Sequence, residues 1–253
     1  MLHRTYPKTR ATVIRMVSAG LSLAAMTLLF VLPGAEFCAW LGWLPRAQFI
    51  PAVMAGETIV IIAIAVSVVL CGRLYCSVVC PLGIAQDLAR RLFGKLKIGN
   101  VKISSSVRYL ILALFVVGMF FGFTGFIAPY GIFGRFLSVG VMRFGEPPIS
   151  MIVWAIALFL FILVMTLFRA RWWCNQVCPV GAFLGLFSRF ALFRVRIDGK
   201  KCGGCGLCSK ACEKGAIVKD GAKVKIDHSK CVACFNCRSV CKKELLHWSP
   251  RGS

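Results

Sequence analysis

Acidic residues and histidines are scarce in this sequence of 253 residues, which contains nine Asp and Glu residues and three histidines. His3, His228 and His247 all lie outside the long apolar runs, so no pair of imidazoles is available inside a membrane span to hold haem. The sequence also lacks a C-x-x-C-H haem-attachment motif and a glycine-rich dinucleotide fingerprint after a strand. These absences argue against a haem protein and a dinucleotide-binding fold, and they leave open a flavin bound in another way.

The scarcity of acid makes the chain strongly basic, with a formal net charge of +22, although only 16% of its residues are charged. Hydrophobic residues make up 58% of the sequence. Because the core of a soluble protein cannot hide that much apolar surface, the composition indicates a protein of the lipid bilayer. The basic residues are then expected to face water, anionic lipid headgroups or an acidic partner, and we expect no nucleic-acid partner.

Four apolar runs are long enough to cross the hydrocarbon of a bilayer, which requires about 20 residues per helix. They cover residues 16–32, 47–72, 109–134 and 147–168. We therefore predict an all-α polytopic membrane domain of four transmembrane helices, arranged as two repeated hairpins. The first run is expected to remain as a helix rather than to be removed as a secretory signal.

The distribution of Lys and Arg predicts the orientation of these helices. The N-terminal flank contains four basic residues and the 73–108 loop contains seven, whereas the 33–48 loop contains one and the 135–146 loop two. Loops rich in Lys and Arg remain on the cytoplasmic side of a bacterial inner membrane. Both termini are therefore expected to be cytoplasmic.

Two acidic residues near the predicted spans are candidates for a specific role. Glu57 is the only ionisable residue inside a span, and such residues are functional candidates by default. We consider it as a catalytic proton acceptor near the outer face; contact with water at the interface is the alternative. Asp87 lies just beyond the second span and is expected to cap a helix or to pair with Arg90 or Arg91.

The composition changes at residue 190, where apolar runs disappear. This boundary divides the chain into a membrane domain, residues 1–189, and a cytoplasmic C-terminal domain, residues 190–253. In the second domain, alternation over residues 193–197 predicts a short strand, and the Asp220-Gly221 turn with its alternating flanks predicts a hairpin. We therefore expect a small α+β fold.

Eight cysteines in the C-terminal domain form two C-x2-C-x2-C-x3-C motifs. In this spacing three thiolates hold one [4Fe–4S] cluster and the fourth ligates the neighbouring cluster. One cluster is therefore assigned to Cys202, Cys205, Cys208 and Cys241. The other cluster is assigned to Cys231, Cys234, Cys237 and Cys212. Disulfides are disfavoured in a reducing cytoplasm, and structural zinc usually takes paired C-x2-C motifs, so a two-cluster ferredoxin-like domain is predicted.

A different cysteine motif occurs twice in the membrane domain. Residues 72–83 read GRLYCSVVCPLG and residues 170–181 read ARWWCNQVCPVG. Each contains two cysteines four residues apart followed by proline, at the point where an apolar run ends in arginine. We call these stretches the first and second C-x3-C-P motifs, and their equivalent positions predict that they are repeats.

The two C-x3-C-P motifs are expected to bring four thiols together. If the preceding helices continue, Cys76 and Cys80 lie on one helical face, and so do Cys174 and Cys178. Two such pairs meeting about a pseudo-twofold axis would suit a further iron–sulfur cluster or a zinc ion, and we leave this choice open. Burial of cysteine as a small hydrophobic residue is the alternative.

The residues that follow each cysteine pair predict the local backbone. Pro81 and Pro179 restrict the preceding residue to extended angles. Gly83 and Gly181 are expected to let the chain bend afterwards.

With these motifs in place, the sequence resembles the NapH/MauN group of ferredoxin-type membrane proteins, which is related to the membrane region of NosR. The resemblance covers nearly all of the chain and rests on the paired C-x3-C-P motifs and the two C-terminal cluster motifs. It implies electron transfer in which the membrane component oxidises quinol beside another iron–sulfur or cytochrome redox protein. The alternative is an accessory protein that supplies electrons for the maturation or reactivation of a partner metalloenzyme.

Overall fold

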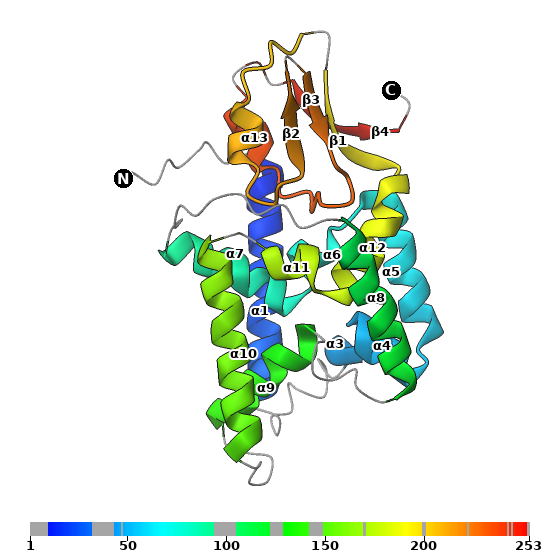
Figure 1. The fold of residues 1–253 in the computed structure, drawn as a ribbon, viewed down its shortest axis with the longest axis vertical. Coiled ribbons are helices and arrows are strands. Elements are labelled where there is room, and N and C mark those ends of the chain that lie inside the picture. Colours follow the sequence, from blue (N-terminus) through cyan, green and yellow to red (C-terminus); the bar gives the residue numbers. More distant parts are fainter. Residues whose placement is uncertain are drawn as a thin grey trace.

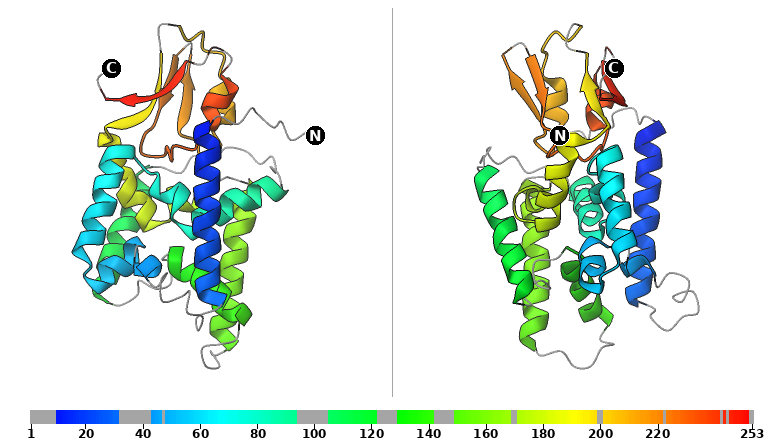
Figure 2. Two further views of the ribbon diagram at one scale, coloured as in Figure 1. Left: turned by 180° about the vertical axis from the view of Figure 1, so that it is seen from behind. Right: turned by 90° about the vertical axis from the view of Figure 1, so that its right-hand side faces the viewer.

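The computed structural model describes residues 10–31, 43–46, 48–93, 105–121, 129–141, 149–168, 171–198, 201–221, 223–241, 243 and 245–251. Helices form the larger part of the molecule, and the short strands lie together at one end of it (Figures 1 and 2). The first helix begins at this same end, so the start of the described chain lies beside its C-terminal part (Figure 2).

The helical part has the same order of elements in each half, in which a long apolar helix, a single short turn and a helix that begins at proline follow one another. In the first half these are α5, α6 and α7, and in the second half α10, α11 and α12. The helices are α1 (Arg10–Val31), α3 (Trp43–Arg46), α4 (Phe49–Ala55), α5 (Thr58–Cys71), α6 (Tyr75–Val78), α7 (Pro81–Phe93), α8 (Ser105–Phe120), α9 (Pro129–Val141), α10 (Ile149–Phe168), α11 (Trp172–Gln176), α12 (Pro179–Phe187) and the 3₁₀ turn η2 (Ser188–Phe190).

Two of the expected spans are not single helices. The run over residues 47–72 is broken after α4, because Gly56 adopts the left-handed conformation (φ 70°) that commonly ends a helix. Glu57 lies in this break. In the run over residues 109–134, α8 ends at Phe120 and a separate helix, α9, begins at Pro129. Proline favours the first turn of a new helix, because its fixed φ is helical and its missing N–H is not needed there.

One helix in the described part of the chain, α1, is long and apolar enough to cross a membrane by length and composition. The apolar stretches over residues 58–71, 107–118 and 152–168 are shorter. They nevertheless present large apolar side chains to the outside, since Ile59 is 80% exposed and Trp154 is 72% exposed. The exposed apolar residues recur along α1, α5, α8 and α10, which is far more than a surface in water normally carries.

The C-terminal part consists of two antiparallel strand pairs and two short helices. Strand β1 (Phe193–Ile197) pairs with β4 (Leu246–Pro250), and β2 (Ile217–Asp220) pairs with β3 (Lys223–Ile226). Helices α13 (Leu207–Ala211) and α14 (Asn236–Val240) pack on each other, and each lies within one cysteine motif. The predicted strand over residues 193–197 and the predicted hairpin are confirmed, and Gly221 in the turn has φ 58°.

A single carboxylate, Asp87 on α7, connects three parts of the chain. Its Oδ1 accepts hydrogen bonds from Lys214 Nζ at 2.6 Å and Arg171 Nε at 3.0 Å. Its Oδ2 accepts from Arg171 Nη2 at 2.8 Å and from Arg15 Nη1 at 3.5 Å. Lys214 belongs to the C-terminal part, Arg171 to the second C-x3-C-P motif and Arg15 to α1. The expected pairing of Asp87 with an arginine of its own helix is therefore wrong.

Burial alone would raise the pKa of Asp87, but Arg171 and then Lys214 hold it well below its usual range. We predict that Asp87→Ala lowers the free energy of unfolding by about 3 to 5 kcal/mol, because it leaves buried cations without their counter-charge. Because the pKa is lowered on folding, this contribution is complete at neutral pH and is lost only as the pH falls through the folded value. Thermal unfolding in detergent measures the loss.

The exposed ion pair between Asp220 and Lys225, at 2.8 Å, supplies the control. Asp220→Ala should leave the melting temperature unchanged, since solvent screens this pair. Equal melting temperatures for the two variants would contradict the role assigned to Asp87.

Candidate functional site

The four cysteines of the C-x3-C-P motifs are all buried, and the structure brings them into one group. Cys76 lies in α6 and Cys80 just before α7, while Cys174 lies in α11 and Cys178 just before α12. Burial, and after it the nearby Cys174 and Cys76, raise the pKa of the Cys80 thiol to about 12. Burial likewise raises the pKa of Cys174 to about 11, with a further contribution from Cys76. Thiols from both halves therefore lie within electrostatic reach of one another, and we call them the four-thiol site.

Two buried arginines cross between the halves and hold the four-thiol site together. Arg73 Nη2 donates to the carbonyl oxygen of Cys174 at 3.2 Å, and Arg171 Nη1 donates to that of Cys76 at 2.6 Å. Each arginine lies three residues before the first cysteine of its own motif and bonds the equivalent cysteine of the other. Both side chains are 0% exposed. This reciprocal arginine pair relates the two motifs as a pseudo-twofold axis would.

The glycines after each cysteine pair make this exchange possible. A Cβ at Gly83 would collide with the carbonyl oxygen of Cys76 and lie 3.4 Å from Arg171 Nη1. A Cβ at Gly181 would collide with the carbonyl oxygen of Cys174 and lie 2.8 Å from Arg73 Nη2. The expectation that these glycines bend the chain is wrong, because both lie inside helices, α7 and α12. Glycine is needed at both positions because a backbone carbonyl and a guanidinium group occupy the space that a side chain would take.

The backbone around the cysteines also differs in part from the prediction. The preceding helix does not continue to Cys76, because α5 ends at Cys71 and Gly72 has φ 71°. Cys178 has φ −65° and ψ 118°, the extended conformation expected before proline. Its sulfur accepts a hydrogen bond from the Gly181 N–H at 3.4 Å. Each cysteine pair is thus presented by a turn and a helix start rather than by one helical face.

The surroundings of the four-thiol site carry buried positive charge. Arg73 also donates to Asn175 Oδ1 at 3.0 Å and to the Ser229 carbonyl oxygen at 2.8 Å, and Arg108 donates to the Gly181 carbonyl oxygen at 2.7 Å. In the described part of the chain, the hydrogen bonds of these two arginines reach only neutral acceptors. Burial, and then repulsion by Arg73, lowers the pKa of Arg108 to about 10.

A buried cation is costly unless an anion compensates it. Four thiolates would supply that negative charge beside Arg73, so the residues present fit an anionic metal–thiolate group. In the described residues, no group of three or more His, Cys, Asp or Glu side chains is arranged to hold a single metal ion.

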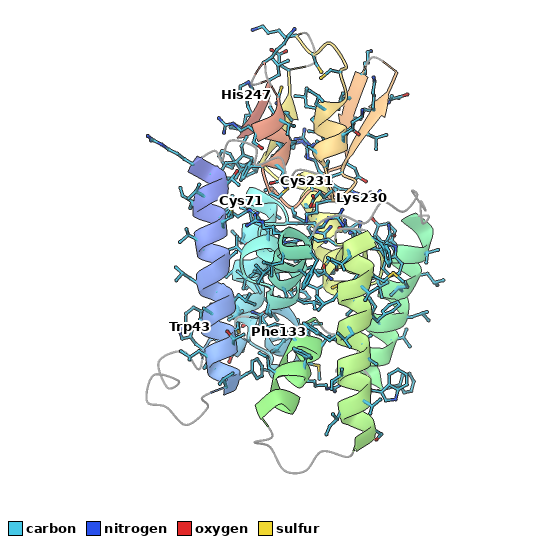
Figure 3. The ribbon with its side chains drawn as sticks, turned by 90° about the vertical axis from the view of Figure 1, so that its left-hand side faces the viewer. Trp43, Cys71, Phe133, Lys230, Cys231 and His247 are labelled. Atoms are coloured by element: carbon cyan, nitrogen blue, oxygen red, sulfur yellow. The ribbon has the colours of Figure 1, made fainter. Side chains whose placement is uncertain are left out.

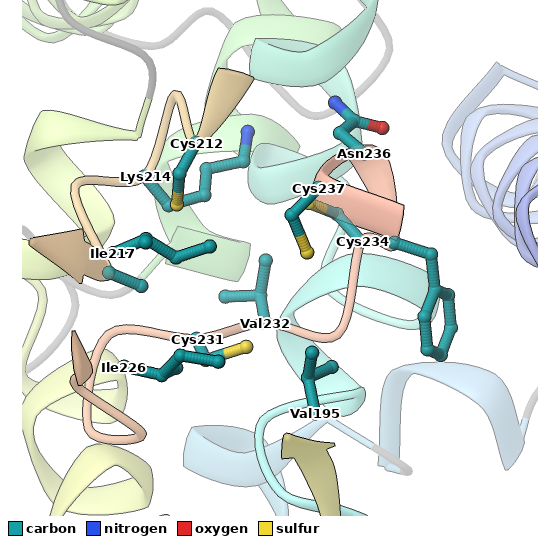
Figure 4. Close-up of a pocket in the computed structure, with 12 residues that line it drawn as sticks. Val195, Cys212, Lys214, Ile217, Ile226, Cys231, Val232, Cys234, Asn236 and Cys237 are labelled. Carbon is teal, nitrogen blue, oxygen red and sulfur yellow. The ribbon is translucent and has the colours of Figure 1, made fainter. Parts of the chain in front are cut away.

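In the C-terminal part, four cysteines line one cavity between α14, β1 and the hairpin (Figure 4). They are Cys212, Cys231, Cys234 and Cys237, the set assigned to one cluster. Three belong to the second cysteine motif and Cys212 to the first, so the two motifs contribute crosswise to this cavity. Apolar side chains such as Ile217 and Val232 complete the lining. Burial raises the pKa of Cys231 to about 12.

The set assigned to the other cluster lies further out. Cys202, Cys205 and Cys208 lie close enough that the first two raise the pKa of Cys208, which burial raises most. Cys205 is exposed and Cys208 is buried. Cys241 directly follows α14, which packs on α13, the helix that contains Cys208. The four ligand assignments of this cluster stay a prediction.

The four-thiol site is joined directly to the loops of the four-cysteine cavity. The Ser229 carbonyl oxygen, which Arg73 binds, lies two residues before Cys231. Asn175 Nδ2 donates to the Lys214 carbonyl oxygen at 3.1 Å, two residues after Cys212. Figure 3 shows Cys231 and Lys230 at the boundary between the strands and the helical part. The cavity cysteines therefore lie on the side of the C-terminal part that faces the four-thiol site.

The side chain of Glu57 is not brought to this site. Glu57 precedes α5, whereas Cys71 ends it, and the 14 residues of this helix separate them by roughly 20 Å. The residues that sequence reasoning missed are Arg73 and Arg171 as partners of the opposite motif, and Asp87 as the partner of Arg171. The available signal was the arginine at the same position of both repeats.

Comparison with known proteins identifies iron–sulfur regions over most of the chain. Residues 53–99 and 151–200 each match a 4Fe–4S binding domain, and residues 201–245 match a 4Fe–4S dicluster domain. The first two regions contain the two C-x3-C-P motifs, and the third contains the eight C-terminal cysteines. The chain is therefore mostly helical with a C-terminal 4Fe–4S ferredoxin-type region and small sheets. No solved structure matches the chain.

Several curated proteins are similar to the chain. A methylamine utilization ferredoxin-type protein MauN from Methylobacillus flagellatus is 34% identical over 148 residues, covering 56% of this chain and 48% of the relative. The ferredoxin-type protein NapH from Escherichia coli is 32% identical over 154 residues, covering 58% and 50%. The regulatory protein NosR from Stutzerimonas stutzeri is 30% identical over 167 residues, covering 62% and 22%. The match thus spans about half the length of the MauN and NapH relatives. The predicted resemblance is confirmed, but it covers 56% to 62% of this chain in these relatives rather than nearly all of it.

The close contacts at the glycines generate a test of the site. We predict that Gly181→Ala lowers the free energy of unfolding by about 1 to 3 kcal/mol, because the added methyl group displaces Arg73 or the Cys174 carbonyl. It should also lower the iron content per chain. Gly20→Ala on α1 is the control, since nothing lies within 4 Å of a Cβ there. If both variants retained the melting temperature and iron of the unmodified protein, the close packing assigned to Gly181 would be wrong.

Proposed function

We propose, from the relationship of this chain to the ferredoxin-type proteins MauN and NapH, that it is a membrane-bound iron–sulfur electron-transfer protein that oxidises quinol and passes electrons to a partner redox protein. The observation that carries this proposal is the four-thiol site, held by the reciprocal arginine pair inside two regions that each match a 4Fe–4S binding domain. A partner of iron–sulfur or cytochrome type fits the proposed role.

The proposed cofactors are three [4Fe–4S] clusters, which would supply one-electron redox chemistry when bound. The four-thiol site would hold one, and the C-terminal part would hold two with the ligand sets assigned above. The chain contributes burial and positive charge: the four thiols are shielded from water, and Arg73 lies between them and Cys231. Both features affect the potential of a bound cluster.

We further propose that the chain crosses a bacterial inner membrane four times, with residues 1–189 as the membrane domain and residues 190–253 in the cytoplasm. The bond between Arg15 of α1 and Asp87 supports this arrangement, because it ties the start of the first helix to the side on which Lys214 lies. Exposed apolar side chains along α5, α8 and α10 suit contact with lipid. Glu57 would then lie towards the outer face, where it would accept a proton from quinol.

An accessory role is the second candidate function. The similarity to a protein named regulatory protein NosR favours it, since a regulatory protein need not turn over substrate itself. In this role the chain would supply electrons for the maturation or reactivation of a partner metalloenzyme. The same cysteines would serve both functions.

The number of clusters tests the four-thiol site. We predict about twelve iron atoms and an equal amount of acid-labile sulfide per chain, with about four of each lost in the Cys76→Ser/Cys174→Ser variant. Cys71→Ser is the control, because this half-buried cysteine lies outside the four-thiol site. About eight irons in the unmodified protein, unchanged by the double substitution, would refute a cluster at this site.

Electron transfer from quinol tests the function itself. We expect a quinol analogue to reduce the iron–sulfur clusters of the purified protein in its native complex, and EPR detects the reduced clusters. In Cys76→Ser/Cys174→Ser, quinol should no longer reduce the C-terminal clusters, whereas dithionite should still do so. If quinol did not reduce the clusters of the unmodified complex, and a deletion strain contained an unmatured partner enzyme, the accessory role would be established instead.

A further inference from the structure

The four-thiol site is not symmetric at one buried position. Gln86 on α7 lies three residues after Gly83, whereas the equivalent residue on α12, three residues after Gly181, is Leu184. Gln86 is 0% exposed, and its Oε1 accepts a hydrogen bond from Cys174 Sγ at 3.2 Å. The first half therefore places a carboxamide against a thiol of the second half, and the second half offers only a hydrocarbon in return.

The carboxamide of Gln86 is only partly satisfied. Its Nε2 is buried and has no hydrogen-bond partner within the part of the chain that the structure describes. Buried amide donors in proteins are nearly always paired, so an unpaired donor at this place needs an acceptor. The oxygen and nitrogen of a carboxamide exchange places by rotation about one bond, and the neighbouring group decides which of them it meets.

Ligation of a metal changes what Cys174 offers to Gln86. The contact at 3.2 Å belongs to a thiol, which donates its proton to Oε1. A metal-bound cysteine is a thiolate, which accepts hydrogen bonds and donates none. Gln86 would then face Cys174 with Nε2, and this rotation would give the sulfur a donor and one of the two buried N–H bonds an acceptor.

We propose that Gln86 donates an N–H···S hydrogen bond to the Cys174 thiolate and so raises the reduction potential of the group held at the four-thiol site. This inference rests on the proposed function, because it requires a redox group there. A hydrogen bond to a ligand sulfur stabilises the more negative, reduced state, and such bonds are among the determinants of cluster potentials. Gln86 acts through a ligand and is therefore a positioning and tuning residue.

The position of Gln86 is fixed by its neighbour in the chain. Asp87 is bound by Arg171 and Lys214, which determines the rotation of α7 about its axis. Arg171 also bonds the carbonyl oxygen of Cys76. Hydrogen bonds therefore connect the helix that carries Gln86 to both C-x3-C-P motifs.

The substitution Gln86→Leu, which copies the second half, tests the proposal. We expect unchanged iron content and a lower midpoint potential for the EPR signal of the four-thiol site in a redox titration. The ratio of reduced to oxidised group at a fixed ambient potential should fall about tenfold, which corresponds to about 59 mV for a one-electron couple. Leu88→Ala on the same helix is the control, because this side chain is 47% exposed and is not part of either C-x3-C-P motif, and it should leave the potential unchanged.

A second substitution separates tuning from packing. In Gln86→Leu/Leu184→Gln, a donor returns at the equivalent position of the other half, and the potential should recover towards that of the unmodified protein. Full iron content with an unchanged potential in Gln86→Leu would overturn the proposal alone. About eight irons in the unmodified protein would overturn it together with the four-thiol cluster. If Gln86→Leu loses iron, Gln86→Met keeps the length of the side chain, and loss of iron in both variants would assign Gln86 a packing role only.

Discussion

The exchange of arginines between the two C-x3-C-P motifs is the constraint on which the rest of the site depends. Because Arg73 bonds the carbonyl of Cys174 and Arg171 that of Cys76, neither motif can present its thiols without the other. The exchange requires glycine on both sides, since any side chain at Gly83 or Gly181 would occupy the space of the backbone and guanidinium groups. A repeated sequence is thereby converted into one shared site.

The same arginines also determine where the C-terminal part lies. Arg73 binds the carbonyl of Ser229, and Arg171 binds Asp87, which in turn binds Lys214. These two contacts of the C-terminal part flank Cys231 and Cys212, which line the cavity in Figure 4. A change at the reciprocal arginine pair is therefore expected to affect the four-thiol site and also the position of that cavity relative to it. Cys205, which belongs to the other set of cysteines, is exposed.

Sequence patterns predicted the features that depend on local spacing. Three such features could be predicted because each is defined by residues close together in the chain. They are the strand over residues 193–197, the hairpin turn at Gly221 and the duplicated motif. The break at Gly56 and the functions of Gly83 and Gly181 were not, since hydropathy does not report backbone conformation or close approach. The partners of Asp87 lie 72, 84 and 127 residues away, and pairings of that kind arise only when the elements pack.

The two halves use a symmetric backbone to build an asymmetric charge distribution. On one side Asp87 neutralises Arg171; on the other its equivalent is Gly185, and the space is taken by the Arg108 guanidinium and the carbonyl of Ser229. Arg171 is therefore paired with a carboxylate, whereas in the described residues the hydrogen bonds of Arg73 and Arg108, on the side that faces Cys231, reach only neutral acceptors, and Asp227 acts on Arg108 without a hydrogen bond. A field of this direction stabilises negative charge at the junction of the four-thiol site and the C-terminal cavity. The difference between the two halves at one residue pair, Asp87 against Gly185, is therefore sufficient to give a symmetric backbone two different electrostatic surroundings.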